Sequence, residues 1–260
     1  MNQNEYQMIE VLKQLQGEYG VFEIKAEFEA EGSRLEELMR LKDVTSRIGL
    51  KLLLKIGGVE AITDIYNGLA LGVNAINAPM AETPFALSKY LNSVKNFIAE
   101  DNRADIEFSF NLETITAFQN LDAMLALPNI DVLQSMTIGR VDLSGSMNLD
   151  RRHVNGDEIF KLCHGAFSKA RAKKLKCALG GAISADSIEF INKMNQDQLI
   201  DKYETRKVVF PAEAVKHGEK AFFKAVEFEL MWLKSKRRYY SGITKEDESR
   251  IAMLEQRTGK

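Results

Sequence analysis

The sequence predicts an α/β protein in which short strands alternate with helices along one chain of 260 residues. Apolar or β-branched runs alternate with longer amphipathic stretches, and the runs begin roughly 20 to 40 residues apart, as βα units require. Alternation of this kind implies parallel strands joined by right-handed crossovers. The length fits one (β/α)8 barrel. An open doubly wound sheet is the alternative.

Seven runs predict strands, whereas a closed barrel needs eight. Another strand could lie in the first twenty residues, but Tyr6 to Leu15 has helical spacing. The predicted strands are Val21–Glu29, Lys51–Gly58, Val73–Met80, Asp105–Glu113, Ile130–Gly139, Leu175–Gly181 and Thr205–Pro211.

The stretches between these runs predict helices. Ser33 and Glu36 have the spacing of a capping box. Thr83 followed by Pro84 suits the first turn of a helix. Three more helices are predicted at Thr114–Leu127, Asp157–Lys173 and Ser184–Met194.

Two helices are predicted beyond the last strand, at Ala212–Lys234 and Thr244–Gln256. The first is rich in Phe, Leu and Met. No linker or composition break separates this region, so residues 1–260 form a single predicted domain with residues 212–260 as a C-terminal helical extension. The apolar residues of the extension pack either on their own barrel or on a neighbouring subunit.

Composition narrows the class of protein. The net charge is −2 and the pI is about 6.0, which gives no basic face for nucleic acid or an anionic membrane. Cys163 and Cys177 make no disulfide framework, so we expect a cytoplasmic protein. The start lacks the basic and apolar regions of a signal peptide. No run reaches the ~18 apolar residues of a membrane span.

Carboxylates gather after the predicted strands, where parallel barrels place their reactive groups. Glu113 and Asp142 each follow a strand and lie 29 residues apart, about one βα unit. Neighbouring strands are ~4.8 Å apart, so the two carboxylates can share one hard divalent ion such as Mg²⁺ or Mn²⁺. A pair of solvated loop acids is the alternative. Glu82 follows the third strand and is a candidate substrate-binding residue.

Two further features point to an anionic substrate. Lys55 lies inside an apolar strand and therefore binds a substrate carboxylate or enolate oxygen, forms a Schiff base, or pairs with a nearby glutamate. The stretch GRVDLSGS (Gly139–Ser146) combines glycines with hydroxyls, including Ser144, that can bind a carboxylate. An ordinary Gly/Ser loop is the alternative.

FNLET (Phe110–Thr114) followed by GRVDLSGS resembles the paired metal-binding motifs of the HpcH/HpaI aldolase and citrate lyase family. INAPMAET (Ile76–Thr83) is similar to that family's preceding strand end. The resemblance covers residues 21–210, and for this reason we prefer the barrel to the open sheet. It also implies a homo-oligomer, a trimer or hexamer, with C-terminal helices exchanged between subunits.

The resemblance implies that Glu113 and Asp142 chelate Mg²⁺ or Mn²⁺, which binds a 2-oxo acid and stabilises its enolate. Backbone amides at Arg140 and Val141 would hold the carboxylate, with Arg140 also a candidate catalytic residue. The expected activity is carbon–carbon cleavage or condensation of a 2-oxo acid or acyl-CoA-type substrate.

Two departures from the family leave other functions open. The family's acid–base histidine follows an early strand, but this chain has EFEAEGSR there and its first histidine is His153. Glu29 or Glu31 is the expected replacement. Lys55 also stands in place of the family's arginine. The alternatives are a phosphoenolpyruvate-type transferase or mutase, and a non-catalytic metabolite-binding or scaffold protein.

Overall fold

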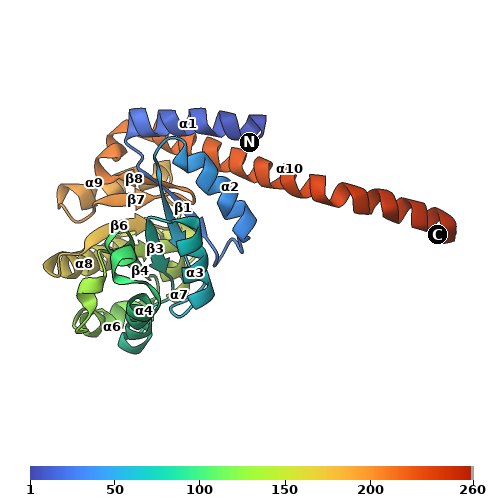
Figure 1. Cartoon of the computed structure of the whole chain (residues 1–260). Helices are drawn as coiled ribbons and strands as arrows, with labels where there is room; N and C mark the ends of the chain where they lie inside the picture. Colours follow the sequence, from blue (N-terminus) through green and yellow to red (C-terminus); the bar gives the residue numbers. More distant parts are fainter. Residues whose placement is uncertain (259–260) are drawn as a thin grey trace.

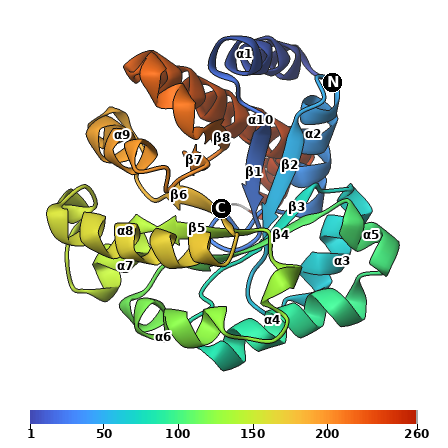
Figure 2. The same ribbon diagram turned by 90° about the vertical axis from the view of Figure 1, so that its left-hand side faces the viewer.

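The computed structural model describes residues 1–258, and within them eight strands close into a barrel in chain order (Figures 1 and 2). The barrel predicted from the sequence is therefore confirmed. The strands are β1 (Glu23–Glu27), β2 (Lys51–Lys55), β3 (Ala75–Ala78), β4 (Glu107–Leu112), β5 (Ser135–Gly139), β6 (Lys176–Gly180), β7 (Lys202–Glu204) and β8 (Val208–Pro211).

Ten α-helices surround or extend this barrel in the described residues. They are α1 (Gln3–Tyr19), α2 (Leu35–Ser46), α3 (Ile62–Leu71), α4 (Pro84–Phe97), α5 (Glu100–Ala104), α6 (Ile115–Leu125), α7 (Arg140–Ser146), α8 (Asp157–Ala172), α9 (Ile188–Gln196) and α10 (Glu219–Thr258). Short 3₁₀ turns lie at 130–132, 151–153, 185–187 and 212–217. None of the helices in the described part of the chain is long and apolar enough to cross a membrane.

The strand that the sequence analysis missed is β7, which has only three residues. It forms a hairpin with β8, and β8 runs antiparallel to both of its neighbours, β7 and β1. Thr205 closes the hairpin, because its amide donates to the Val208 carbonyl and its hydroxyl accepts from the Val208 amide. The expectation of parallel strands joined by helical crossovers is therefore wrong for β8. The hairpin places Arg206 at its turn.

Most predicted helix starts agree with the structure. The Thr83 and Thr114 hydroxyls accept hydrogen bonds from the backbone amide three residues on and cap α4 and α6. The α2 cap is displaced by one residue, because Arg34 rather than Ser33 is the N-cap. The stretch GRVDLSGS is not a loop, since Arg140–Ser146 forms α7.

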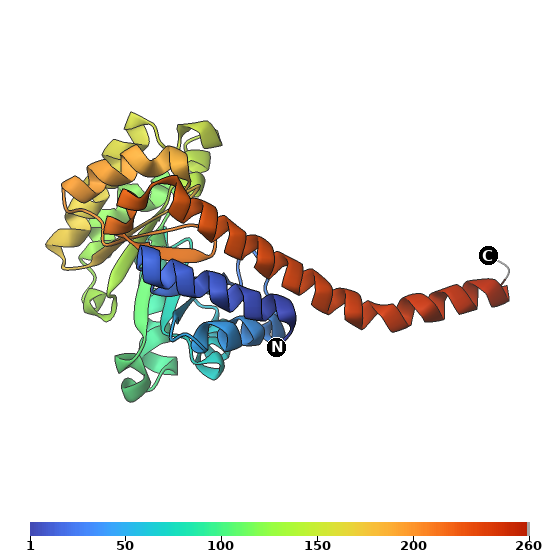
Figure 3. The same cartoon turned by 90° about the horizontal axis from the view of Figure 1, so that it is seen from above.

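The C-terminal region differs from the prediction. Its two expected helices are one 40-residue helix, α10, because the single Gly242 does not interrupt it. The first half of α10 packs along α1, and the second half runs out from the barrel (Figures 1 and 3).

Alternation along the strands sorts side chains between two layers. Ile24, Leu54 and Phe108 belong to the apolar core shared by barrel and helices. Other strand positions place ionic groups in the barrel interior, where Lys202 Nζ lies 3.4 Å from Glu23 Oε2 and 3.1 Å from Glu107 Oε1. The barrel interior is thus partly polar, and polar residues also lie at the carboxyl ends of the strands.

Candidate functional site

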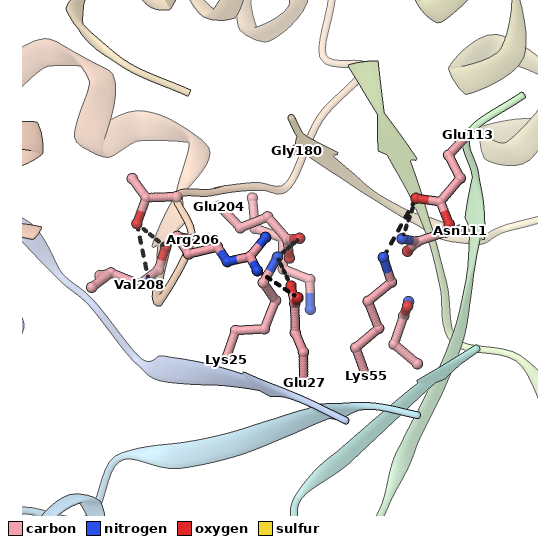
Figure 4. A network of polar contacts seen from close by, with 12 residues as sticks. Lys25, Glu27, Lys55, Asn111, Glu113, Gly180, Glu204, Arg206 and Val208 are labelled. Carbon is pink, nitrogen blue, oxygen red and sulfur yellow. Dashed lines mark hydrogen bonds and ion pairs between the residues drawn. The ribbon is translucent and has the colours of Figure 1, made fainter. Parts of the chain in front are cut away.

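A cavity of about 1120 Å³ opens at the carboxyl ends of strands β1, β2 and β4 to β7. Its wall includes side chains from the strand ends, the segment after β6, the β7–β8 hairpin and α10. In Figure 4 the charged residues at the strand ends form two groups, one around Glu113 and one around Glu27. At the strand ends, the carboxylates Glu27, Glu29, Glu113, Asp142 and Glu204 lie with the cations Lys25, Lys55 and Arg206, and further charges of both signs line the rest of the cavity.

Glu113 and Asp142, the predicted metal pair, line this cavity together. Glu113 follows β4, and its carboxylate accepts hydrogen bonds from the Met80 amide (3.0 Å) and from Asn111 Nδ2 (2.8 Å). Burial raises the pKa of Glu113, and the negative charge of Asp142 adds to that effect. The positive charge of Lys55 and the hydrogen bonds from Met80 and Asn111 act in the opposite direction and lower that pKa.

Glycine at position 139 makes room for the Glu113 carboxylate. A Cβ at that position would lie 2.7 Å from Glu113 Oε2. Gly181 lies close to the start of α7. A Cβ added at position 181 would lie 2.5 Å from the Arg140 amide nitrogen and 2.7 Å from the Val141 amide nitrogen. The Gly181 φ of +80° also favours glycine. The backbone at Gly181 therefore packs closely against the first amides of α7, and only glycine fits there.

Lys55 ends β2 and reaches the same part of the cavity. Its Nζ lies 2.7 Å from Glu29 Oε2 and 3.6 Å from Glu113 Oε2. Burial alone would lower the pKa of Lys55, but the two carboxylates outweigh it and raise that pKa. Pairing with nearby glutamates, one of the alternatives considered for this lysine, is what the structure contains.

The second charged group was not predicted as a unit. Lys25 Nζ lies 2.7 Å from Glu204 Oε1 and 3.2 Å from Glu27 Oε1, and Arg206 lies 3.5 Å from Glu27 Oε2. Lys25 and Glu27 are two residues apart on β1, which puts both side chains on the interior face. Charged residues recurring at every second position of a strand are the sequence signal that could have revealed them.

Arg140 lies elsewhere than its predicted role requires. Its side chain is fully buried below the cavity wall and donates to the carbonyls of Gly180 (3.1 Å), Gly181 (2.8 Å) and Val154 (3.2 Å). The guanidinium also lies 4.7 Å from the centre of the Phe190 ring. With its donors engaged by backbone, the side chain holds the loop after β6 against α7. The expected catalytic role of the Arg140 side chain is therefore not supported, whereas its amide remains a candidate.

Some of the other predicted site residues line the cavity, and others lie outside it. Gly139 and Val141 line the cavity with Glu29. Ser144 does not line it, because its hydroxyl is buried and donates to the Arg140 carbonyl. Glu82 also lies outside, where it accepts a hydrogen bond from the Thr114 hydroxyl at 2.7 Å. Ser144 and Glu82 therefore stabilise the surrounding turns and are not brought into the candidate site.

The donor set fits Mg²⁺ or Mn²⁺ better than a metal that needs a full set of protein ligands. No cluster of three or more His, Cys, Asp or Glu side chains suited to a metal is found among residues 1–258. Mg²⁺ commonly uses one or two carboxylates and keeps several waters for the remaining positions. Glu113 and Asp142 could hold such an ion, while zinc sites normally use three or four protein ligands.

Comparison with solved structures shows the fold. An HpcH/HpaI aldolase from Desulfitobacterium hafniense DCB-2 is similar at a TM-score of 0.58 and 14% identity, over 72% of this chain and 78% of that one. The citrate synthase SbnG is similar at 0.61 and 14%, over 89% and 90%. An HpcH/HpaI aldolase/citrate lyase family protein from Burkholderia cenocepacia J2315 gives 0.58 and 10%, over 74% and 80%.

Sequence comparisons add nothing to this result, because no family model and no curated protein matches the chain. The similarity to these solved structures shows that the protein has the barrel fold of the HpcH/HpaI aldolase and citrate lyase family. The resemblance predicted from FNLET and GRVDLSGS is confirmed at the level of the fold.

Proposed function

We propose that this protein is a divalent-metal-dependent carbon–carbon lyase that acts through a pyruvate-type enolate of a 2-oxo acid. The observation that carries the proposal is that Glu113 and Asp142 line one cavity of this fold. Mg²⁺ or Mn²⁺ held by the pair would supply Lewis-acid stabilisation of negative charge on the substrate oxygens.

The residues around the pair suit the same substrate. The Lys55 ammonium lies 3.6 Å from Glu113, so it can stabilise negative charge that develops on an enolate oxygen beside it. The amides of Arg140 and Val141 lie at the start of α7, where Val141 lines the cavity, and are the candidate donors to the substrate carboxylate. These groups are fixed before substrate arrives, so little reorganisation is needed as charge develops.

The rest of the cavity holds the other part of the substrate. At about 1120 Å³ it exceeds the ~300–1,000 Å³ typical of small-molecule sites. Part of its wall is apolar, with Ile183 and Phe222 among the lining residues. This wall can accommodate the second half of a cleaved 2-oxo acid or the pantetheine arm of an acyl-CoA.

The test is a calorimetric titration of pyruvate and oxalate into the purified protein, with and without Mn²⁺. Oxalate resembles the planar enolate of pyruvate. We expect binding that requires Mn²⁺ and is lost in Glu113→Gln, because that variant removes one of two anionic ligands but keeps the side-chain shape. Glu82→Gln, the same change outside the cavity, is the matched control and should bind as the parent does.

Two other results would change the proposal. Metal-dependent binding without turnover of any 2-oxo acid or acyl-CoA thioester would favour a metabolite-binding protein. Turnover of phosphoenolpyruvate instead would favour a transferase or mutase. A folded, Mn²⁺-loaded protein that binds neither pyruvate nor oxalate would overturn the enolate site altogether.

We also infer that the protein forms a homo-oligomer through α10. Phe223, Val226, Leu230 and Leu233 are exposed at helical spacing on this helix, and Phe223 is 75% exposed. An apolar stripe on a helix that runs out from its own barrel (Figure 3) suits burial by a second copy of the chain. A trimer or hexamer is expected.

Light scattering on the eluting protein tests this interface. The parent should elute as a trimer or hexamer, and Leu230→Glu combined with Leu233→Glu should shift it towards a monomer, because buried charge opposes association. Lys234→Glu is the control, because Lys234 is exposed and lies beside the apolar stripe without belonging to it. A monomeric parent protein would contradict the inference.

A further inference from the structure

A second cavity, of about 370 Å³, lies outside the barrel where α1, α2 and α10 meet. Its volume falls within the ~300–1,000 Å³ that is typical of small-molecule sites. None of the residues that line it also lines the large cavity at the strand ends. The second cavity can therefore hold a ligand of its own, whatever occupies the site of Glu113 and Asp142.

Two buried polar side chains of α10 line this cavity without a partner. Trp232 is 2% exposed and Ser235 is 5% exposed. No hydrogen bond within residues 1–258 uses the Trp232 indole N–H or the Ser235 hydroxyl, and neither atom is fully enclosed, so both are open to the cavity. Ser241, by contrast, donates to the carbonyl four residues before it, while the carbonyl four residues before Ser235, that of Met231, accepts from Asn4 Nδ2 at 2.9 Å. Because buried indole and hydroxyl groups usually have a partner, these two groups point to a ligand.

The buried acids in the cavity wall already have partners. Both carboxylate oxygens of Glu5 accept hydrogen bonds from Arg40. One oxygen of Glu37 accepts from the Tyr240 hydroxyl, and the other lies 2.8 Å from Lys236 Nζ. The two buried carboxylates are therefore engaged by protein groups and are not available to a cationic ligand.

The groups that remain free are mainly hydrogen-bond donors. The Trp232 indole can only donate, and the Ser235 hydroxyl can donate or accept. Arg238 also lines the cavity, is exposed, and forms no ion pair within residues 1–258. Glu36 is the one lining acid without an ion pair in the part of the chain that the structure describes, and it is exposed to solvent. Two buried donors and a free guanidinium favour an anion, and the Trp232 ring offers an apolar surface beside them.

We propose that this cavity is a binding site for a small organic carboxylate. The carboxylate accepts hydrogen bonds from Trp232 and Ser235 and faces the charge of Arg238, while a short apolar chain packs against the indole ring. The cavity lies where α10 passes α1 and α2 before it extends away from the barrel (Figure 1). A bound carboxylate would therefore join these three helices.

Trp232 is the only tryptophan in the chain, so tryptophan fluorescence reports directly on this cavity. Titration of 3-methylbutanoate into the full-length protein, with EDTA present to remove divalent metal, should give a saturable change in that fluorescence. The uncharged 3-methylbutanamide should bind more weakly, because hydrogen bonds to a charged acceptor are roughly twice as strong. The cation 3-methylbutylammonium should give no saturable change.

Two substitutions should weaken the binding of 3-methylbutanoate. Ser235→Ala should lower the affinity by about 10-fold or more, as the loss of one hydrogen bond to a charged group predicts, and alanine keeps the helix intact. Arg238→Gln should also lower it, because the free cation is removed. Ser241→Ala and Arg237→Gln are the matched controls, since both residues lie on α10 outside the cavity, and both variants should bind as the parent does.

The other outcomes would overturn the proposal in different ways. A response to the ammonium compound as strong as that to the carboxylate would contradict an anion site. The absence of any saturable change with all three compounds would show that the cavity holds solvent alone. Parent affinity in both Ser235→Ala and Arg238→Gln would place the ligand elsewhere. A response lost in Glu113→Gln would place it in the barrel cavity, whereas an unchanged response keeps this site independent of the function proposed above.

Discussion

Replacing Arg140 by leucine is expected to lower the free energy of unfolding by about 3–5 kcal/mol. The side chain is fully buried, and its removal leaves the carbonyls of Gly180, Gly181 and Val154 without donors. Each unpaired buried carbonyl costs about 1–3 kcal/mol. Urea denaturation followed by circular dichroism measures the change.

Two variants separate this structural role from catalysis. Arg47→Leu makes the same change at an exposed residue paired with Asp43 on one helix, and should cost under about 0.5 kcal/mol. Arg140→Lys keeps the charge but loses the planar fork, so it should also destabilise the fold. In its folded fraction, Mn²⁺-dependent oxalate binding should be unchanged. Lost binding in fully folded Arg140→Lys would restore the role first predicted for this arginine.

The second large effect is expected at Gly139. Alanine there should lower the affinity for Mn²⁺ by about 10–100-fold, as other changes around metal ligands do. The backbone angles, φ −93° and ψ 95°, are open to alanine, so the effect comes from the methyl group, which would lie 2.7 Å from Glu113 Oε2. The Glu113 carboxylate must then move from its present position. Titration of Mn²⁺ by calorimetry or electron paramagnetic resonance measures the loss.

Gly145→Ala is the matched control for this experiment. Gly145 lies in the same short helix, α7, and no atom lies within 4 Å of its added Cβ. Alanine should leave Mn²⁺ affinity unchanged and stabilise the helix by about 0.5–1 kcal/mol. If Gly139→Ala binds Mn²⁺ as tightly as Gly145→Ala does, Glu113 is not a ligand of the ion.

The sequence was informative where local chemistry repeats along the chain. Apolar runs predicted seven of the strands, and Thr83 and Thr114 predicted two helix starts. The spacing of Glu113 and Asp142 predicted that they share one site, because residues at the ends of neighbouring parallel strands must converge. Both residues line the cavity, while metal binding itself stays a prediction.

Residues with tertiary partners were harder to assign. Arg140 follows a strand just as Asp142 does two residues later, yet its side chain lies under the cavity and holds the loop after β6. Its partners come from other parts of the chain, and nothing in its local sequence indicates them. The same holds for Glu27, since only the fold shows that it shares Lys25 with Glu204 and lies near Arg206.

The sequence by itself determined the α/β class, the order of most elements and the placement of Glu113 and Asp142 in one cavity, because these follow from period-two and period-3.6 patterns and from short spacings. Only the tertiary structure decided how the barrel closes. Closure depends on β7, a three-residue strand too short to carry a sequence pattern, and on its antiparallel partner β8. It also decided which charged side chains face the cavity. Charges of one type are interchangeable in sequence, and their roles depend on burial and on partners brought together by folding.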